Sequence, residues 1–178
     1  MADFEAAVEK LLDIEGGFSP RDNANGAVNL GITSYFLKLI GRPHSVDDVR
    51  ALTPEVAKAI YRAYFWEKFN VGKLLAQRIA EALLICLVNT NPQDVIFALQ
   101  ESLADIGHPL MERKVPKGSR ILGLVTVGTI NCLTSAERDE LMVTFKRRMS
   151  AHYESLAASN PAEFADDAAG WKNRMETL

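Results

Sequence analysis

The sequence has few cysteines and few histidines, and each shortage excludes a class of site. Two cysteines, Cys86 and Cys132, do not make the disulfide framework of a small secreted domain, although a disulfide between them stays open. Cys86 lies in the apolar run 82–88, so we expect a buried thiol there. The three histidines are scattered without metal-ligand spacing. We therefore expect no metal site and no cofactor.

The chain also lacks an excess of basic residues and any long apolar run. Lys and Arg number 20 against 23 Asp and Glu, which gives a formal net charge of −3. Nucleic-acid-binding proteins usually carry a basic excess, so we expect no nucleic-acid partner. No apolar run is long enough to span a bilayer, and the first residues do not resemble a secretion signal. We expect synthesis in the cytoplasm, no stable membrane insertion, and a separate export route for any work in the periplasm or cell wall.

What the sequence does contain is helical periodicity. Its 178 residues are 48% apolar, enough to bury a substantial core. Apolar side chains recur at spacings of three and four residues, and capping signals mark several helix starts. We expect helices at about 4–15, 34–40, 54–69, 74–88, 92–106 and 135–158, with short ones after 45 and 160. The prediction is an all-α fold with at most a small β-hairpin near residues 18–32. Residues 107–131 are expected to be irregular, because glycine and proline punctuate them.

A glutamate stands where the first predicted helix should end, in Glu15-Gly16-Gly17, before the polar, turn-rich stretch 19–29. A carboxylate at a helix C-terminus faces the negative end of the helix dipole, which disfavours its charged form. The acid that cleaves a glycosidic bond needs this property, since it must hold a proton near neutral pH for the leaving oxygen. Taken alone, these residues fit a solvated glutamate before a glycine helix stop more often than a catalytic acid.

Four motifs, in one order along nearly the whole chain, resemble those of glycoside hydrolase family 108, the phage-type muramidases with their secretion-assisting members. The first comprises Glu15-Gly16-Gly17-Phe18-Ser19, Asp22, Asn25-Gly26, Asn29 and Gly31-Ile32-Thr33. The others are the stretch from Leu52 to Tyr61 with Phe65-Trp66, Val88-Asn89-Thr90-Asn91-Pro92 with Leu99-Gln100, and Gly170-Trp171-Lys172-Asn173-Arg174. Any one of them alone would be a weak signal.

The resemblance implies a mainly helical, lysozyme-like fold. Residues 1–90 would be the catalytic region, and residues 91–178 a helical region related to a peptidoglycan-binding module, the two forming one compact unit. The implied reaction is hydrolysis of the β-1,4 bond between N-acetylmuramic acid and N-acetylglucosamine in peptidoglycan glycan strands, with Glu15 as catalytic acid. Asp22 is either the second carboxylate or a residue that braces the loop. The candidate substrate-binding residues are Asn25, Asn29, Thr33, Tyr61, Trp66 and Asn89.

The same resemblance suggests two biological roles, a prophage endolysin or a secretion-assisting muramidase. In either role a holin or a secretion apparatus would bring the protein to the wall. Trp66, one of the candidates for sugar contact, belongs to an aromatic pair on a predicted buried helix. Such pairs more often belong to the core.

The chain departs from the family in the loop after Glu15. The family shows D-P-G-G-x-T there, whereas Asp22 comes two residues early and Val28 stands in place of the threonine. Valine has no hydroxyl, so a water that the threonine orients would need Asn25 or Asn29 instead. Two alternatives therefore stay open. One is a catalytically impaired protein that binds peptidoglycan without cutting it, and the other is a lytic transglycosylase that uses the same glutamate.

Overall fold

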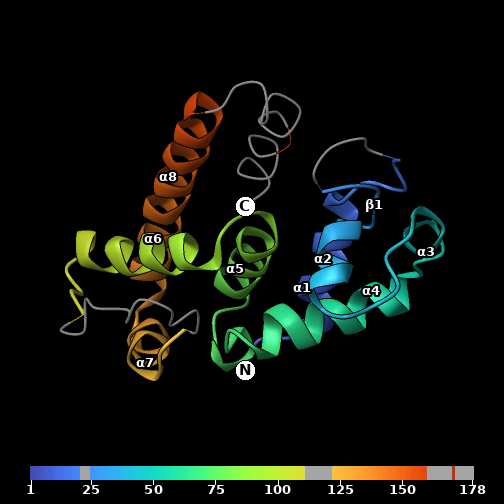
Figure 1. The fold of residues 1–178 in the computed structure, drawn as a ribbon. Helices are drawn as coiled ribbons and strands as arrows, with labels where there is room; N and C mark the ends of the chain where they lie inside the picture. Colours follow the sequence, from blue (N-terminus) through green and yellow to red (C-terminus); the bar gives the residue numbers. More distant parts are fainter. Residues whose placement is uncertain (21–24, 111–121, 160–169, 171–178) are drawn as a thin grey trace.

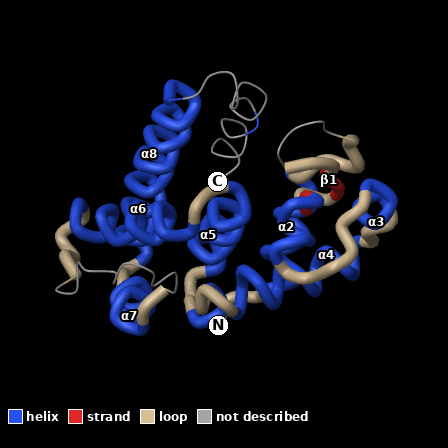
Figure 2. Tube along the Cα trace, viewed as in Figure 1, coloured by secondary structure: helices blue, strands red, loops and turns tan. Residues whose placement is uncertain are grey.

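The computed structural model describes residues 1–20, 25–110, 122–159 and 170. Within them the chain is mainly helical, with one small antiparallel sheet (Figures 1 and 2). The α-helices are α1 (Phe4–Ile14), α2 (Ser34–Leu39), α3 (Val46–Arg50), α4 (Pro54–Tyr61), α5 (Gln77–Asn89), α6 (Pro92–Asp105), α7 (Leu124–Cys132) and α8 (Ser135–Ser159). Strands β1 (Val28–Asn29) and β2 (Ile32–Thr33) form a hairpin, and a π-helix η1 (Arg62–Glu67) and a 3-10 helix η2 (Val71–Lys73) follow α4. The predicted all-α fold with a small hairpin near 18–32 is confirmed.

Helix α5 lies at the centre of the molecule. In Figure 1 helices α6, α7 and α8 lie on one side of it, and α1 to α4 with the hairpin lie on the other. It packs against α1, η1, η2, α6 and α8. Most of its residues are buried, Cys86 among them with 0% exposure, as the apolar run predicted. Burial raises the pKa of the Cys86 thiol to about 12, so this sulfur stays protonated.

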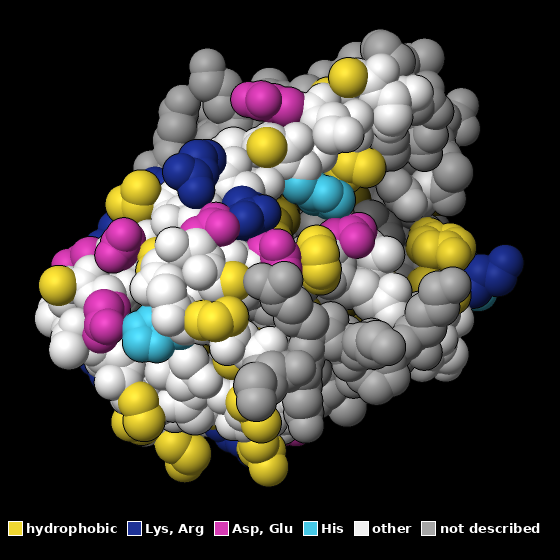
Figure 3. Space-filling model, turned by 90° about the vertical axis from the view of Figure 1, so that its left-hand side faces the viewer, with side chains coloured by type: hydrophobic (Ala, Val, Ile, Leu, Met, Phe, Trp, Pro, Cys, Tyr) yellow, Lys and Arg dark blue, Asp and Glu magenta, His cyan; other side chains and the backbone are white. Residues whose placement is uncertain are grey.

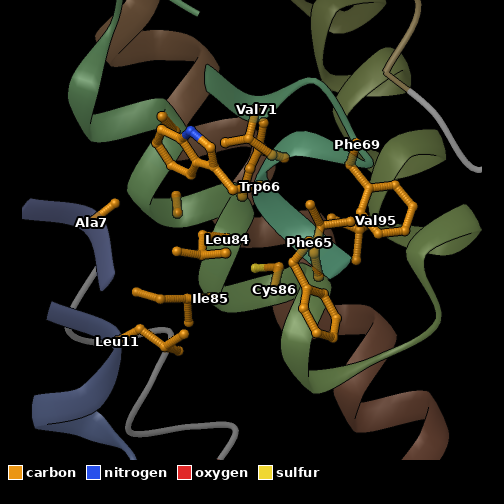
Figure 4. Close-up of a cluster of buried hydrophobic side chains, with 14 of the residues drawn as sticks. Ala7, Leu11, Phe65, Trp66, Phe69, Val71, Leu84, Ile85, Cys86 and Val95 are labelled. Atoms are coloured by element: carbon orange, nitrogen blue, oxygen red, sulfur yellow. The ribbon is translucent and has the colours of Figure 1, made fainter. Parts of the chain in front are cut away.

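The core is one continuous cluster that crosses residue 90. Figure 4 shows part of it, with Leu11 of α1 beside Ile85 of α5 and with Val95 of α6 in the same cluster. Buried side chains of α8, such as Phe145, extend it further. Apolar burial of this extent is the main driving force for folding. The division into regions 1–90 and 91–178 stays a prediction.

The local signals in the sequence place most helix starts correctly. Ser45 and Asp48 form a capping box at the start of α3, where the sequence predicted a short helix after residue 45. Before α8, Thr134 and Glu137 bond each other's backbone N–H groups in the same way. Helix α1 ends at Ile14, just before the glycine pair, as predicted. The helix expected over 54–69 divides into α4 and the π-helix η1.

One element was missed: residues 107–131 were expected to be irregular, yet Leu124–Cys132 form α7. Val127 and Ile130 are buried one helical turn apart, and their packing outweighs the low helix propensity of a stretch that contains Gly128. The short helix expected after residue 160 lies outside the described residues.

The face that α6 to α8 present carries charges of both signs. In Figure 3, Lys and Arg side chains are interspersed with Asp and Glu across the described part of this face. Arg148 of α8 and Asp105 of α6, for example, pair at 2.7 Å. None of the described helices is both long and apolar enough to span a membrane.

Candidate active site

Glu15 is the residue that ends α1. Its backbone N–H still donates to the Leu11 carbonyl at 3.0 Å, but its own backbone is extended. Leu11 is fully buried, and Lys10 forms an ion pair with Glu81 of α5 at 3.3 Å, so α1 is fixed against α5 just before Glu15. The side chain of Glu15 is half-buried. The sequence predicted this position at a helix C-terminus, and it is confirmed.

Asn89, the last residue of α5, is the first partner of the Glu15 carboxyl. Its Nδ2 donates to the Ile85 carbonyl at 2.7 Å, which anchors the amide on its own helix. The same nitrogen lies 3.5 Å from Glu15 Oε1, as a second, longer hydrogen bond. An amide nitrogen carries two protons and can serve both acceptors. The two helix ends therefore meet at the carboxyl group.

The turn of the hairpin forms the second neighbour of Glu15. Leu30 and Gly31 connect β1 to β2, and both have positive φ, 52° and 75°, as in the two-residue type I′ turns of tight hairpins. A Cβ on Gly31 would lie 2.8 Å from both Cγ and Cδ of Glu15. Only glycine lets the backbone come this close to the side chain. The Leu30 N–H also donates to the Gly16 carbonyl at 3.2 Å, which ties the turn to the residue after Glu15.

Tyr61, at the end of α4, lies behind this turn. It is 1% exposed, and its hydroxyl donates to the Leu30 carbonyl at 2.7 Å. A Cβ on Gly31 would lie 2.6 Å from the Tyr61 oxygen. Tyr61 was predicted to bind substrate, but its hydroxyl donates to the backbone of the turn and its ring lies against Phe65.

One partly exposed carboxyl group thus has both an amide donor and the backbone of a turn among its neighbours. Such a group can carry a proton to a bound substrate while its position is fixed by its neighbours. Within the described residues, no group of three or more His, Cys, Asp and Glu side chains is arranged to hold a metal ion. The chemistry that this arrangement supports is acid catalysis by Glu15.

Two of the predicted substrate-binding residues, Asn29 and Thr33, bond to backbone groups of the protein itself. Asn29 is 8% exposed, and its amide lies 3.1 Å from the Val49 carbonyl, at the C-terminal end of α3. Thr33 caps α2, its hydroxyl accepting from the Phe36 N–H at 3.1 Å.

Trp66 is 5% exposed and packs edge-to-face on Phe4 at the opposite end of α1 from Glu15. Phe4 and Glu15 are roughly 16 Å apart along the helix axis, at 1.5 Å per residue. A surface pocket of about 530 Å³ also lies at that end, bordered by Phe4, Arg62 and Trp66. We do not assign it to the site, because the Glu15 carboxyl lies at the other end of the helix.

The loop after Glu15 is described in part. Asp22 lies outside the described residues, so its role as second carboxylate stays a prediction. Asn25 is exposed, and its backbone carbonyl accepts from the Tyr35 N–H at 3.1 Å. Val28 exchanges both backbone hydrogen bonds with Ser19, at 2.8 and 2.9 Å.

Leu30 and Gly31 are the site residues that the prediction left out. Gly31 stands in the quoted Gly31-Ile32-Thr33 motif, and a glycine between two short strand segments is a hairpin signal. Leucine at the first turn position hides that signal, because asparagine, aspartate or glycine is expected there.

Two comparisons with known proteins give a match, one to a family model and one to a solved structure. Residues 8–90 match the family model described as Glycosyl hydrolase 108. No curated protein was found to match the chain. Among solved structures the chain is similar to SagA of Brucella abortus, with 21% sequence identity, a TM-score of 0.68, and coverage of 98% of this chain and 94% of that one. That likeness shows a shared fold, and the predicted lysozyme-like, mainly helical architecture is confirmed. The stretch that matches the glycosyl hydrolase 108 model, residues 8–90, contains Glu15, Gly31, Tyr61 and Asn89.

Proposed function

We propose that this protein is a muramidase, which hydrolyses the β-1,4 bond between N-acetylmuramic acid and N-acetylglucosamine in peptidoglycan. The observation that carries the proposal is the Glu15 carboxyl, half-buried at the end of α1 between the Asn89 amide and the Leu30–Gly31 turn. The family match over the same residues supports it. Peptidoglycan glycan strands are the proposed partner.

Glu15 acts in this mechanism as the general acid. It gives its proton to the glycosidic oxygen while the bond to the sugar carbon breaks with oxocarbenium character, and water then adds to that carbon. The Asn89 amide donates to the carboxylate that the proton transfer leaves behind. Asp22 is our candidate to stabilise the positive charge or to activate the water. Asn25, exposed on the loop, is our candidate for a polar contact to the glycan.

The experiment is wall clearing by the purified full chain on isolated peptidoglycan, with Glu15→Gln beside it. Glutamine keeps the shape and removes only the acid, so we expect activity to fall by about 100-fold or more, the lower range of general acid catalysis. Asp13→Asn is the matched control, because Asp13 is an exposed carboxylate near the same helix end. It should keep wild-type activity. Circular dichroism would verify that all three proteins are folded.

The remaining outcomes separate the alternative functions. Binding to the wall without clearing by the wild type would favour the impaired, peptidoglycan-binding protein. Clearing that yields fragments lighter by one water would favour a lytic transglycosylase over a hydrolase. Equal activity of wild type and Glu15→Gln would remove Glu15 from the mechanism.

The biological role follows from this activity as a further part of the proposal. The protein acts on the wall from the periplasmic side, either as a prophage endolysin or as a muramidase that assists secretion. A holin or a secretion apparatus would bring it there. Lysis of cells that co-express a holin, but not of cells without one, would favour the endolysin.

A further inference from the structure

We infer that Tyr61 is a positioning residue that holds the Glu15 carboxyl in place through the Leu30–Gly31 turn, rather than a residue that touches the glycan. This inference rests on the proposed function of Glu15. It starts from burial, because Tyr61 is 1% exposed and so has almost no surface to offer a substrate. Its hydroxyl instead donates to the Leu30 carbonyl at 2.7 Å.

The turn needs an external restraint. Leu30 has a φ of 52°, a left-handed conformation that side chains with a Cβ rarely adopt. Two hydrogen bonds secure it there. The Tyr61 hydroxyl donates to its carbonyl, and its own N–H donates to the Gly16 carbonyl at 3.2 Å. A leucine at this position is therefore kept in its turn by α4 on one side and by the residue after Glu15 on the other.

The Leu30–Gly31 turn also limits where the Glu15 side chain can go. The point where a Cβ on Gly31 would stand lies 2.8 Å from Glu15 Cδ and 2.6 Å from Tyr61 Oη. The two atoms are therefore at most about 5.4 Å apart, the sum of those distances, with the Gly31 backbone beside both. If the turn withdraws, Glu15 gains room beside Gly31. A displacement of about 1 Å in a catalytic group can lower turnover by about 100-fold.

The test compares Tyr61→Phe with Tyr153→Phe. Both changes remove one buried hydroxyl and keep the ring, and Tyr153 of α8 lies against Cys86 rather than the turn. We expect Tyr61→Phe to lower kcat by about 10- to 100-fold with KM within about twofold, and Tyr153→Phe to change neither. A raised KM with unchanged kcat would show that Tyr61 binds substrate, and would overturn the inference. Equal kinetic losses in the two variants would do the same.

A rescue tests the route through the turn. Asparagine tolerates positive φ and is favoured in type I′ turns, so Leu30→Asn should restore at least part of the turnover lost in Tyr61→Phe. Failure of this double variant to gain activity over Tyr61→Phe, while folded, would contradict a route through Leu30.

A spectroscopic readout keeps the inference separate from the proposed function. The Leu30 amide should exchange with solvent faster in Tyr61→Phe than in the wild type, and the side-chain ¹³C carboxyl signal of Glu15 should shift. Both should stay unchanged in Tyr153→Phe. If the wild type cleaves no peptidoglycan, the muramidase proposal fails, and these signals alone decide the inference. An unshifted Glu15 signal in Tyr61→Phe would then refute it.

Discussion

Replacing Gly31 by alanine tests the contact between the hairpin turn and Glu15 directly. The φ of 75° would cost alanine about 1–2 kcal/mol, and the stiffer unfolded chain would return about 0.4–1 kcal/mol of that. The new Cβ would also lie 2.6 Å from the Tyr61 oxygen and 2.8 Å from Glu15 Cγ and Cδ. Relieving such an overlap costs about 1–3 kcal/mol. We expect a total loss of about 2–4 kcal/mol in the free energy of unfolding.

The two neighbours of that Cβ do not move with equal ease. Tyr61 is a buried ring, whereas the half-buried Glu15 side chain has rotatable bonds and can swing away. Movement of Glu15 relieves part of the overlap, which keeps the stability loss near the lower end of the range. It also takes the carboxyl from its place, so activity should fall by about 100-fold.

Gly41→Ala is the matched control for the backbone contribution. Gly41 has a φ of 70°, but a Cβ there would meet nothing within 4 Å. Its alanine variant should lose only about 1 kcal/mol and keep its activity. Urea unfolding followed by circular dichroism would give the stabilities, and wall clearing the activities. Equal stability losses in the two variants, or full activity of Gly31→Ala, would refute the close approach of the turn to Glu15.

Two further predictions concern residues away from the carboxyl. Asn29→Ala should lower the free energy of unfolding by about 1–3 kcal/mol, because the Val49 and Arg50 carbonyls lose the amide donor at 3.1 and 3.3 Å. An unchanged urea midpoint would contradict this. A thiol reagent at pH 8 should modify exposed Cys132 quickly and buried Cys86 only after unfolding. Rapid modification of both cysteines in the folded protein would argue against the burial of Cys86. Since the Cys86 pKa is raised to about 12, only the unfolded chain ionises this thiol between about pH 9 and 12, and stability should fall as pH rises through that range.

The helical architecture could be predicted because its signals are local. The capping box at Ser45 and the glycine pair after Glu15 each act within one or two turns of backbone. Helix α7 could not be predicted in this way, because glycine and β-branched residues disfavour a helix until Val127 and Ile130 are packed in the core.

The site could be predicted only in part, because its contacts join distant segments. The helix-end position singled out Glu15, and the resemblance then made both Glu15 and Asn89 candidates for the site. Gly31 could not be placed beside Glu15 from the sequence, since that contact depends on the left-handed backbone of Leu30 and on a hydroxyl from α4. Asn29 has an amide side chain that could bind a sugar. That amide instead donates to the Val49 carbonyl near the C-terminal end of α3.

The substitution of Val28 for the family threonine bears on one half of the proposed reaction only. The backbone of Val28 makes both hydrogen bonds to Ser19 and pairs with Thr33 in the hairpin, and neither contact needs a side-chain hydroxyl. Valine has the branched shape of threonine, so the strand keeps its form and the turn keeps its place against Glu15. The proton-donating part of the mechanism therefore stands independently of the substitution. What the missing hydroxyl removes is one means of orienting water, a step for which Asp22 and Asn25 remain our proposed candidates. Wall clearing reports on both halves of the reaction, whereas the mass of the released fragments reports on the water step alone.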